Sequence, residues 1–378
     1  MTPSLRQQIE QEIRARGPMS FARYMEICLY DPAAGYYSRN AEQFGKAGDF
    51  YTSSDVHAVF GRLMARKFDE MWRALGSPPA VELLELGPGR GLFARDVIDW
   101  SRKKFPDFFA ALHYTLQESS PSLRVKLAES LRQHIEAGKA ALGPSDDRLE
   151  YEQITRSPDH PITRSPCIVF ANEFFDALPV EILSAQGKLH LSLDDGRLRE
   201  VWLPPTTADF EFLDRYGVHP EGVERIEVAL AAQHWMTNIA RSIARGFLIV
   251  IDYGYTRAEQ LAGHHRGTLM TYRQHSASPN PYGAPGEQDI TAHVNFTALA
   301  SAAEQAGLQV EPLRTQSQFL MQIGEMNRFA DAFEDCSLPQ ERAKVALQLK
   351  HLVTPAGMGE NFQVLIAKRG VDDPPASG

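Results

Sequence analysis

Cysteines and long apolar runs are both scarce in this chain of 378 residues. Cys28, Cys167 and Cys336 are odd in number, lie far apart and form no Cys-x-x-Cys pair, which argues against a disulfide framework or a zinc site. No stretch approaches the roughly 18 apolar residues of a membrane-spanning helix, and the N-terminal residues lack the apolar core of a signal peptide. These absences predict a cytoplasmic protein with no metal site and no membrane insertion.

Positive charge is scarce as well. The 39 lysine and arginine residues are outnumbered by 48 aspartate and glutamate residues, so the net charge is −9. A chain with this acidic balance has no overall attraction to phosphate backbones, which makes nucleic acid a poor candidate for a partner. Hydrophobic residues make up 43% and charged residues 23%, as in soluble globular proteins, and the length allows a large buried core.

The first eighty residues are predicted to be mostly helical. Apolar side chains recur at helical spacing over Leu5–Ile13, Phe21–Leu29 and Val56–Leu75. Residues 44–54 are rich in glycine and hydroxyl groups and have no periodicity, which indicates an ordered loop. Residues 1–79 are therefore expected to form a helical cap, with a loop, in front of a core.

From residue 80 onward, short apolar runs alternate with helical stretches such as Pro121–Glu136, and Phe319–Leu352 is helical in pattern. Such alternation predicts an α/β fold with a parallel sheet covered by helices on both faces. The expected strands are Val81–Leu86, His113–Gln117, Leu149–Ile154, Cys167–Ala171, Phe247–Ile251, Leu308–Leu313 and Phe362–Ala367.

One region breaks this alternation. Leu183–Leu203 has the pattern of a β-hairpin that turns at Asp194–Gly196, and we interpret it as an insertion. The expected segments are the cap at 1–79, the first part of the core at 80–182, an insertion with hairpin and helix at 183–245, the rest of the core with C-terminal helices at 246–370, and a disordered tail at 371–378.

The most informative stretch is Val81–Leu86 followed by the glycine-rich turn Gly87–Gly91. A strand that enters a tight turn before a helix is the place where α/β sheets bind nucleotides. The spacing is Gly-x-Gly-x-Gly, not the Gly-x-Gly-x-x-Gly of dinucleotide sites, so S-adenosylmethionine is favoured over a dehydrogenase cofactor. A plain glycine-rich connection would have the same pattern. The cofactor-binding candidates in the turn are Gly87, Pro88, Gly89 and Gly91.

An acidic residue follows the next expected strand. Glu118, with Ser119 beside it, comes directly after His113–Gln117. A carboxylate at this strand tip can accept hydrogen bonds from both ribose hydroxyls of a nucleoside. A solvated surface carboxylate is the alternative for Glu118 alone, but the glycine turn and the acid together favour a cofactor site.

A third polar group follows the apolar strand Cys167–Ala171. Asn172, Glu173 and Asp176 should lie at the carboxyl edge of the sheet, among bulky apolar side chains. Fixed polar groups in an apolar pocket suit the orientation of a methyl acceptor and the exclusion of water. We therefore predict Glu173, Asp176 and Asn172 as catalytic, Asn172 also as a cofactor ligand, and Phe174 and Phe175 as substrate contacts. The alternative is that the aromatic rings belong to the core.

Two further segments offer weaker candidates for the acceptor pocket. Tyr253 follows an apolar strand at the same edge and either lines the pocket or connects elements. Asp289 lies in a polar loop and either contacts substrate or belongs to the cap of the helix that starts near Asn295. The pair His264 and His265 has no metal-ligand spacing and is predicted to lie at the surface.

Seven motifs span nearly the whole chain and lie at residues 17–21, 29–32 with 35–37, 48–53, 85–91, 172–179, 251–255 and 289–294. In combination they resemble the MidA-like family of class I methyltransferases, which includes the mitochondrial complex I assembly methyltransferase of eukaryotes. Ser54 departs from the pattern, because relatives are expected to carry proline there.

The resemblance implies a Rossmann-like, seven-stranded sheet with one antiparallel strand, supplied by Phe362–Ala367, and S-adenosyl-L-methionine as cofactor. It also implies arginine methylation of an NADH dehydrogenase subunit. Guanidinium groups pair bidentately with carboxylates, so Glu173, with Asp176, would align the acceptor nitrogen. The loop expected to cover the cofactor carries Asp49, Phe50, Thr52 and Ser53.

The main functional prediction is thus a protein arginine methyltransferase. A small-molecule methyltransferase is an alternative within the same chemistry, although the insertion and the cap favour a protein substrate. A non-catalytic assembly factor that binds the cofactor and a partner is an alternative of another class.

Overall fold

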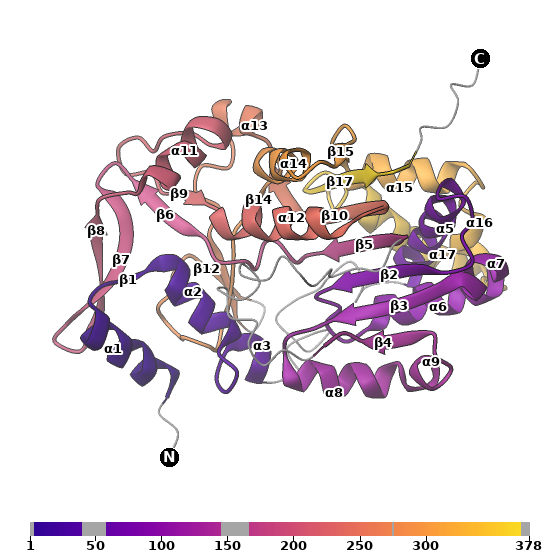
Figure 1. The fold of residues 1–378 in the computed structure, drawn as a ribbon, viewed down its shortest axis with the longest axis horizontal. Coiled ribbons are helices and arrows are strands. Elements are labelled where there is room, and N and C mark those ends of the chain that lie inside the picture. Colours follow the sequence, from indigo (N-terminus) through magenta and orange to yellow (C-terminus); the bar gives the residue numbers. More distant parts are fainter. Residues whose placement is uncertain (1–3, 40–57, 145–165, 274–275, 372–378) are drawn as a thin grey trace.

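The computed structural model describes residues 4–39, 58–144, 166–273 and 276–371. A large, mostly parallel sheet runs through the molecule, and a smaller antiparallel sheet lies on the side of the N-terminal helices (Figure 1). The α/β class predicted from the alternation is confirmed. No helix within the described ranges is long and apolar enough to cross a membrane.

The large sheet has the strand order β15-β17-β10-β5-β2-β3-β4. Neighbours from β10 to β4 pair in parallel, whereas β17 runs antiparallel to β10 and to β15. The antiparallel strand predicted at Phe362–Ala367 is therefore confirmed. The bounds are β15 (Gln309–Val310), β17 (Phe362–Arg369), β10 (Gly246–Tyr255), β5 (Cys167–Asn172), β2 (Val81–Leu86), β3 (Leu112–Gln117) and β4 (Ala140–Leu142), with short β14 (Val294–Asn295) on β10 and β16 (Arg314–Thr315) on β17.

The apolar runs form strands because both faces of the sheet are buried. Along β5, Ile168 and Phe170 point into one apolar cluster, and Val169 and Ala171 point into the other. The first cluster is covered by α5 (Ala58–Ala74), α6 (Leu92–Lys104), α7 (Pro106–Ala111), α8 (Pro121–Ser130), α15 (Gln316–Glu325), α16 (Ala330–Phe333) and α17 (Pro339–Val353). The second is covered by α12 (Leu230–Ser242) and α14 (Phe296–Gln305).

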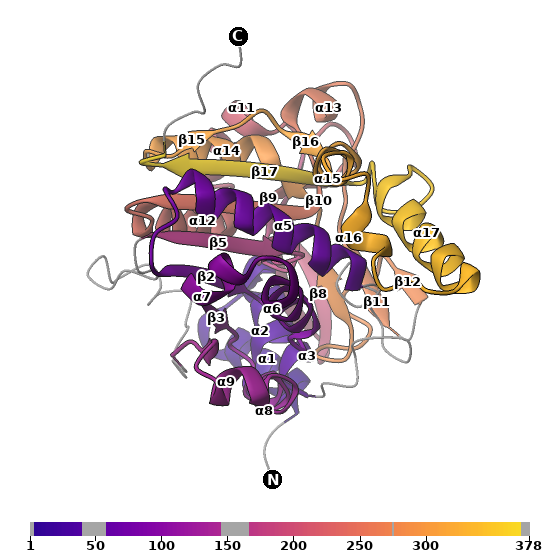
Figure 2. The ribbon, with the colours of Figure 1, turned by 90° about the vertical axis from the view of Figure 1, so that its right-hand side faces the viewer.

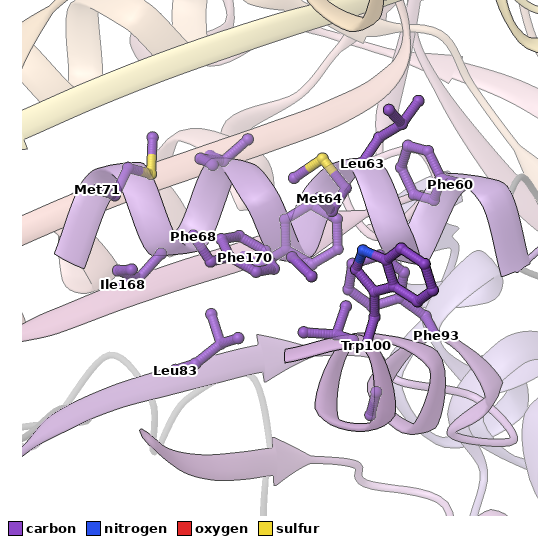
Figure 3. Packing of buried hydrophobic residues seen from close by; sticks show 14 of the residues in the cluster. Phe60, Leu63, Met64, Phe68, Met71, Leu83, Phe93, Trp100, Ile168 and Phe170 are labelled. Atoms are coloured by element: carbon purple, nitrogen blue, oxygen red, sulfur yellow. The ribbon is translucent and has the colours of Figure 1, made fainter. Parts of the chain in front are cut away.

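Aromatic rings hold α5 and α6 onto the sheet. Figure 2 shows α5 crossing the stacked strands, and Figure 3 shows the side chains between them. The ring of Phe170 on β5 stacks on Phe93 of α6, with centroids 4.7 Å apart, and meets Phe68 of α5 edge-on at 5.6 Å. These contacts fix the strand that ends in Asn172, so the core sets the position of a predicted site residue.

The smaller sheet joins the insertion to the N-terminal helices. β7 (Gly187–Asp194) and β8 (Arg197–Leu203) form the predicted hairpin, and its turn at Asp195 and Gly196 has positive φ at both residues, which such two-residue turns require. The other strands are β1 (Met19–Ser20), β6 (Glu181–Ser184) and β9 (Ile226–Val228), in the order β1-β7-β6-β9. The helices beside it are α1 (Leu5–Arg16), α2 (Phe21–Tyr30), α3 (Tyr36–Arg39) and α11 (Thr207–Tyr216).

Two predicted helices are interrupted. The helix expected over Pro121–Glu136 breaks at Leu131 into α8 and α9 (Arg132–Glu136), and the buried Leu131 packs against the glycine turn. The stretch Phe319–Leu352 is broken where Phe329, at φ 57°, folds its ring over α15, and again before Pro339.

The remaining strand predictions differ in extent. Leu308–Leu313 is reduced to the two residues of β15, and Leu149–Ile154 lies outside the described residues. A third sheet comprises β11 (Met270–Arg273), β12 (Ser276–Ser278) and β13 (Asp289–Thr291), and α13 (Arg257–Leu261) follows β10. The division into five segments stays a prediction.

Candidate functional site

The carboxyl ends of β2, β3, β5 and β10 lie at one edge of the large sheet, because these strands run parallel. The glycine turn leaves β2 there. Gly87 N donates to the carbonyl of Gln117 (3.1 Å), and Gly91 N donates to that of Pro88 (2.9 Å). Gly87, Gly89 and Gly91 have φ of 63°, 54° and 73°, a region that disfavours other residues. The turn delivers the chain into α6 with its free N–H groups at this edge.

The three glycines have different surroundings. A Cβ at Gly91 would lie 2.7 Å from Leu127 Cδ2, and one at Gly87 would lie 3.1 Å from Phe174 Cδ2. A Cβ at Gly89 would have no atom of the described residues within 4 Å. A side chain at Gly87 or Gly91 would thus crowd its neighbours, whereas the backbone at Gly89 borders space that no described residue fills and that a cofactor can approach closely.

Glu118 lies beside this turn. Its side chain is 8% exposed, its Oε1 accepts from Ser120 N (2.8 Å), and the backbone N–H of Gly89 also hydrogen-bonds to it. Burial raises the pKa of Glu118 to about 7, although the backbone hydrogen bonds oppose the rise. Ser119 is exposed next to it. The predicted ribose acceptor and the glycine turn therefore meet, and the carboxyl group changes charge near neutral pH.

We expect cofactor affinity to fall as the pH is lowered below 7. Only the ionised Glu118 accepts hydrogen bonds with both oxygens, so its protonation should weaken binding by up to about tenfold per pH unit. Calorimetric titration with S-adenosylhomocysteine between pH 5.5 and 8.5 measures this. Glu118→Gln should bind more weakly at pH 8 and lose this pH dependence; an equally steep profile in the variant would contradict the assignment.

The strand β5 ends at Asn172, which is followed by Glu173. Asn172 Nδ2 donates to Glu173 Oε1 (3.1 Å), whereas the buried Asn172 Oδ1 has no hydrogen-bond partner among the described residues. Glu173 has a φ of 50°, which is unfavourable for a side chain of this type. Such strain is retained where the surrounding structure requires it, often at functional sites. The pair thus places an available acceptor atom and a carboxylate together at the sheet edge.

Three further carboxyl groups lie near Glu173, and together the four are here called the carboxylate cluster: Glu173, Asp176, Asp252 and Asp289. Asp176, Asp252 and Asp289 are 5%, 0% and 2% exposed. Burial, together with the charge of Glu173, raises the pKa of Asp252, although backbone N–H groups that donate to its oxygens oppose the rise. Burial and proximity to the other three raise the pKa of Asp176 well above its usual value. The cluster therefore favours either bound protons or a bound cation.

The N-terminal helices contribute to the same region. Tyr37 Oη donates to Asp289 Oδ1 (2.9 Å), and Tyr30 Oη donates to the carbonyl of Ala177 (2.9 Å). Ser120 Oγ donates to the carbonyl of Tyr37 (2.7 Å), which connects the cofactor edge to the same helices. The cap thus contacts the sheet edge through Tyr30 and Tyr37, two residues of the motif at 29–32 with 35–37 that were not predicted as site residues.

The two phenylalanine candidates pack against other apolar and aromatic side chains. Phe175 is buried in the core beside α12, and Phe174 packs edge-on against Phe175 and Trp235. Their substrate contacts stay predictions. Tyr253 borders the cluster: burial raises the pKa of its hydroxyl group, and the nearby charges of Glu173 and Asp176 raise it further. The loop candidates Asp49, Phe50, Thr52 and Ser53 lie outside the described residues.

The prediction that both adjacent histidines lie at the surface is wrong for one of them. His264 is exposed, but His265 is half-buried, with its Nδ1 3.2 Å from His293 Nδ1. The ring of His265 also stacks on Tyr255, with centroids 5.3 Å apart. These contacts join His265 to β10 and to the segment around His293, and such pairings are not reported by periodicity.

The sequence profile of the family described as "Putative S-adenosyl-L-methionine-dependent methyltransferase" matches residues 63–313. The chain belongs to this methyltransferase family. A Drosophila melanogaster relative named protein arginine methyltransferase NDUFAF7 homolog, mitochondrial, is 30% identical over 97% of this chain and 85% of its own length. The human protein arginine methyltransferase NDUFAF7, mitochondrial, is 28% identical over 96% of this chain and 82% of its own length.

A solved structure agrees with the family. A Burkholderia thailandensis protein bound to S-adenosyl-homocysteine superposes with a TM-score of 0.83, at 28% identity, over 98% of this chain and 92% of that chain. This methyltransferase therefore has the class I fold and uses S-adenosyl-L-methionine. The open space at Gly89 and the available Asn172 Oδ1 fit such a ligand. The predicted cytoplasmic location is wrong, because the curated relatives are mitochondrial proteins.

Proposed function

We propose that this methyltransferase modifies arginine side chains of a protein substrate. The carboxylate cluster beside the cofactor edge carries the proposal, because three of its four carboxyl groups are at most 5% exposed. A guanidinium is always charged and presents donors that match carboxylate oxygens. The cost of burying these acids is offset when such a cation enters. The relatives named as protein arginine methyltransferases support the same acceptor.

In this proposal the chain holds both reactants and manages one proton. Glu118 and the glycine turn hold the cofactor, which supplies an activated methyl group on a sulfonium when bound. Glu173 and Asp176 pair with the guanidinium and direct one nitrogen toward the methyl group, so that the reaction becomes effectively unimolecular. One of these carboxylates, ionised beside the bound cation, also accepts the proton that the nitrogen loses. Asn172 Oδ1 is the acceptor for a donor of the cofactor or the substrate.

The resemblance to the MidA-like family nominates a subunit of NADH dehydrogenase as the first acceptor to test. Purified chain, isotopically labelled cofactor and subunits of that complex are incubated together, and labelled residues are located by mass spectrometry. The proposal expects label on arginine and no label after substitution of that arginine by lysine. Label on a metabolite would support a small-molecule methyltransferase, and cofactor binding without any labelled product would support an assembly factor; either result contradicts the proposal.

A further inference from the structure

The carboxyl group of Asp252 is an unusual feature of the sheet. It follows Leu248 and Val250 on the face of β10 that packs in the apolar cluster with α12 and α14, and it is fully buried. A carboxyl group in such a layer is costly unless its oxygens accept hydrogen bonds. Its role must therefore lie in the contacts that it makes.

Within the described part of the chain, the hydrogen bonds that Asp252 accepts all come from backbone N–H groups. Asp252 Oδ2 accepts from Phe174 N (3.2 Å), Phe175 N (2.9 Å) and Asp176 N (3.3 Å). Its Oδ1 accepts from Tyr253 N (2.9 Å). In addition, Glu173 N donates to the carbonyl of Ile251 (2.9 Å). Two consecutive residues of β10 thus hold four consecutive amides of the segment that follows β5.

We propose that Asp252 is the positioning residue of the methyl-acceptor site, and that its carboxyl group fixes the backbone on which Glu173 and Asp176 are presented. The inference rests on the proposed function for the roles of those two acids. The contacts explain how Glu173 keeps a φ of 50°, because the amides on its C-terminal side cannot rotate without leaving Asp252. Asp252 itself acts only through this segment.

Asp252→Asn tests the inference with little change of volume. An amide oxygen accepts more weakly than a carboxylate, and the amide nitrogen would face the N–H of Tyr253 as donor against donor. The matched control is Glu227→Gln. Glu227 is 4% exposed, and its Oε1 accepts from Thr268 N (2.7 Å) and Leu269 N (2.9 Å), away from the 173–176 segment.

The first measurement is amide hydrogen exchange of residues 174–176 in the full chain. In the wild-type protein these amides should exchange slowly, and Asp252→Asn should accelerate them about tenfold or more, whereas Glu227→Gln should leave them unchanged. The inference would be overturned if the wild-type amides exchanged as fast as those of an exposed loop. This test uses only the wild-type protein, so it can be made even if the variant does not fold. Unchanged exchange in a folded Asp252→Asn protein would overturn it as well.

The second measurement separates positioning from general destabilisation. Asp252→Asn should lower kcat for arginine methylation about 10- to 100-fold, with the Kd for S-adenosylhomocysteine within about twofold of wild type. Full activity despite accelerated exchange would overturn the positioning role. A wild-type protein that methylates no arginine would instead contradict the proposed function, and the exchange data would still decide whether Asp252 fixes the segment.

Discussion

Replacement of Glu173 by glutamine is expected to lower methyl transfer to arginine by about 100- to 10,000-fold. Glutamine keeps the size of the side chain and can still accept at Oε1 from Asn172 Nδ2, so the local geometry is retained. It removes the charge that pairs with the guanidinium and favours loss of its proton. Rates are measured with labelled cofactor at saturating acceptor, and S-adenosylhomocysteine binding should change by no more than about threefold.

Glu82→Gln is the matched control for that experiment. Glu82 is a half-buried carboxylate near the start of β2, at the opposite end of the strand from the glycine turn, and it accepts from Thr115 Oγ1 (2.8 Å). Its variant should keep activity within about twofold. Equal losses in the two variants would point to stability as the cause, and an active Glu173→Gln protein would rule out the proposed role of this carboxylate.

Glu173→Gly provides a further test of why this residue is retained. A side chain at positive φ costs about 1 kcal/mol or more, which glycine does not incur. We expect Glu173→Gly to unfold at a denaturant concentration no lower than wild type while activity is lost. A clearly destabilised variant would mean that the side chain contributes to folding, and the positive φ would then be no sign of function.

The element types and the sheet edge were predictable because they depend on local pattern. The sequences of β2 and β5 are mostly apolar, which is the pattern of strands buried on both faces of a parallel sheet. The residues that follow parallel strands then lie at the same edge of the sheet. This rule predicts that Glu118 lies near the glycine turn, and in the structure the backbone N–H of Gly89 hydrogen-bonds to its carboxyl group. The roles of these residues in binding and catalysis stay predictions until the variants are measured.

What the pattern missed depends on contacts between distant segments. The predicted strand covers Phe247–Ile251 and stops before Asp252, a residue type that is unfavourable in strands. In the structure β10 continues to Tyr255, since amides of another segment neutralise that cost. The hydrogen bond of Tyr37 to Asp289 joins residues 252 positions apart, and no local periodicity encodes it.

Phe170→Ala is expected to cause the largest loss of stability, about 3 to 5 kcal/mol. The ring is fully buried on β5, between Phe93 of α6 and Phe68 of α5 (Figure 3), so its removal leaves a cavity between rigid elements. Urea unfolding should show a lower midpoint with an unchanged m-value. Phe210→Ala, at a ring that is 45% exposed on α11, should change stability by no more than about 0.5 kcal/mol.

The Phe170 variant also tests whether the core positions the site. Phe170 lies two residues before Asn172 on the same strand, so a loosened strand should weaken cofactor binding as well as folding. Saturation with S-adenosylhomocysteine at 100 times the variant's Kd should restore about 2.7 kcal/mol of stability, because the ligand binds only the folded chain. If Phe170→Ala lowered the free energy of unfolding by less than about 2 kcal/mol, Phe93 and Phe68 must move to fill the cavity. If cofactor affinity stayed intact despite the full loss of stability, the hydrogen bonds between the strands, and not this ring, would hold the sheet edge in position.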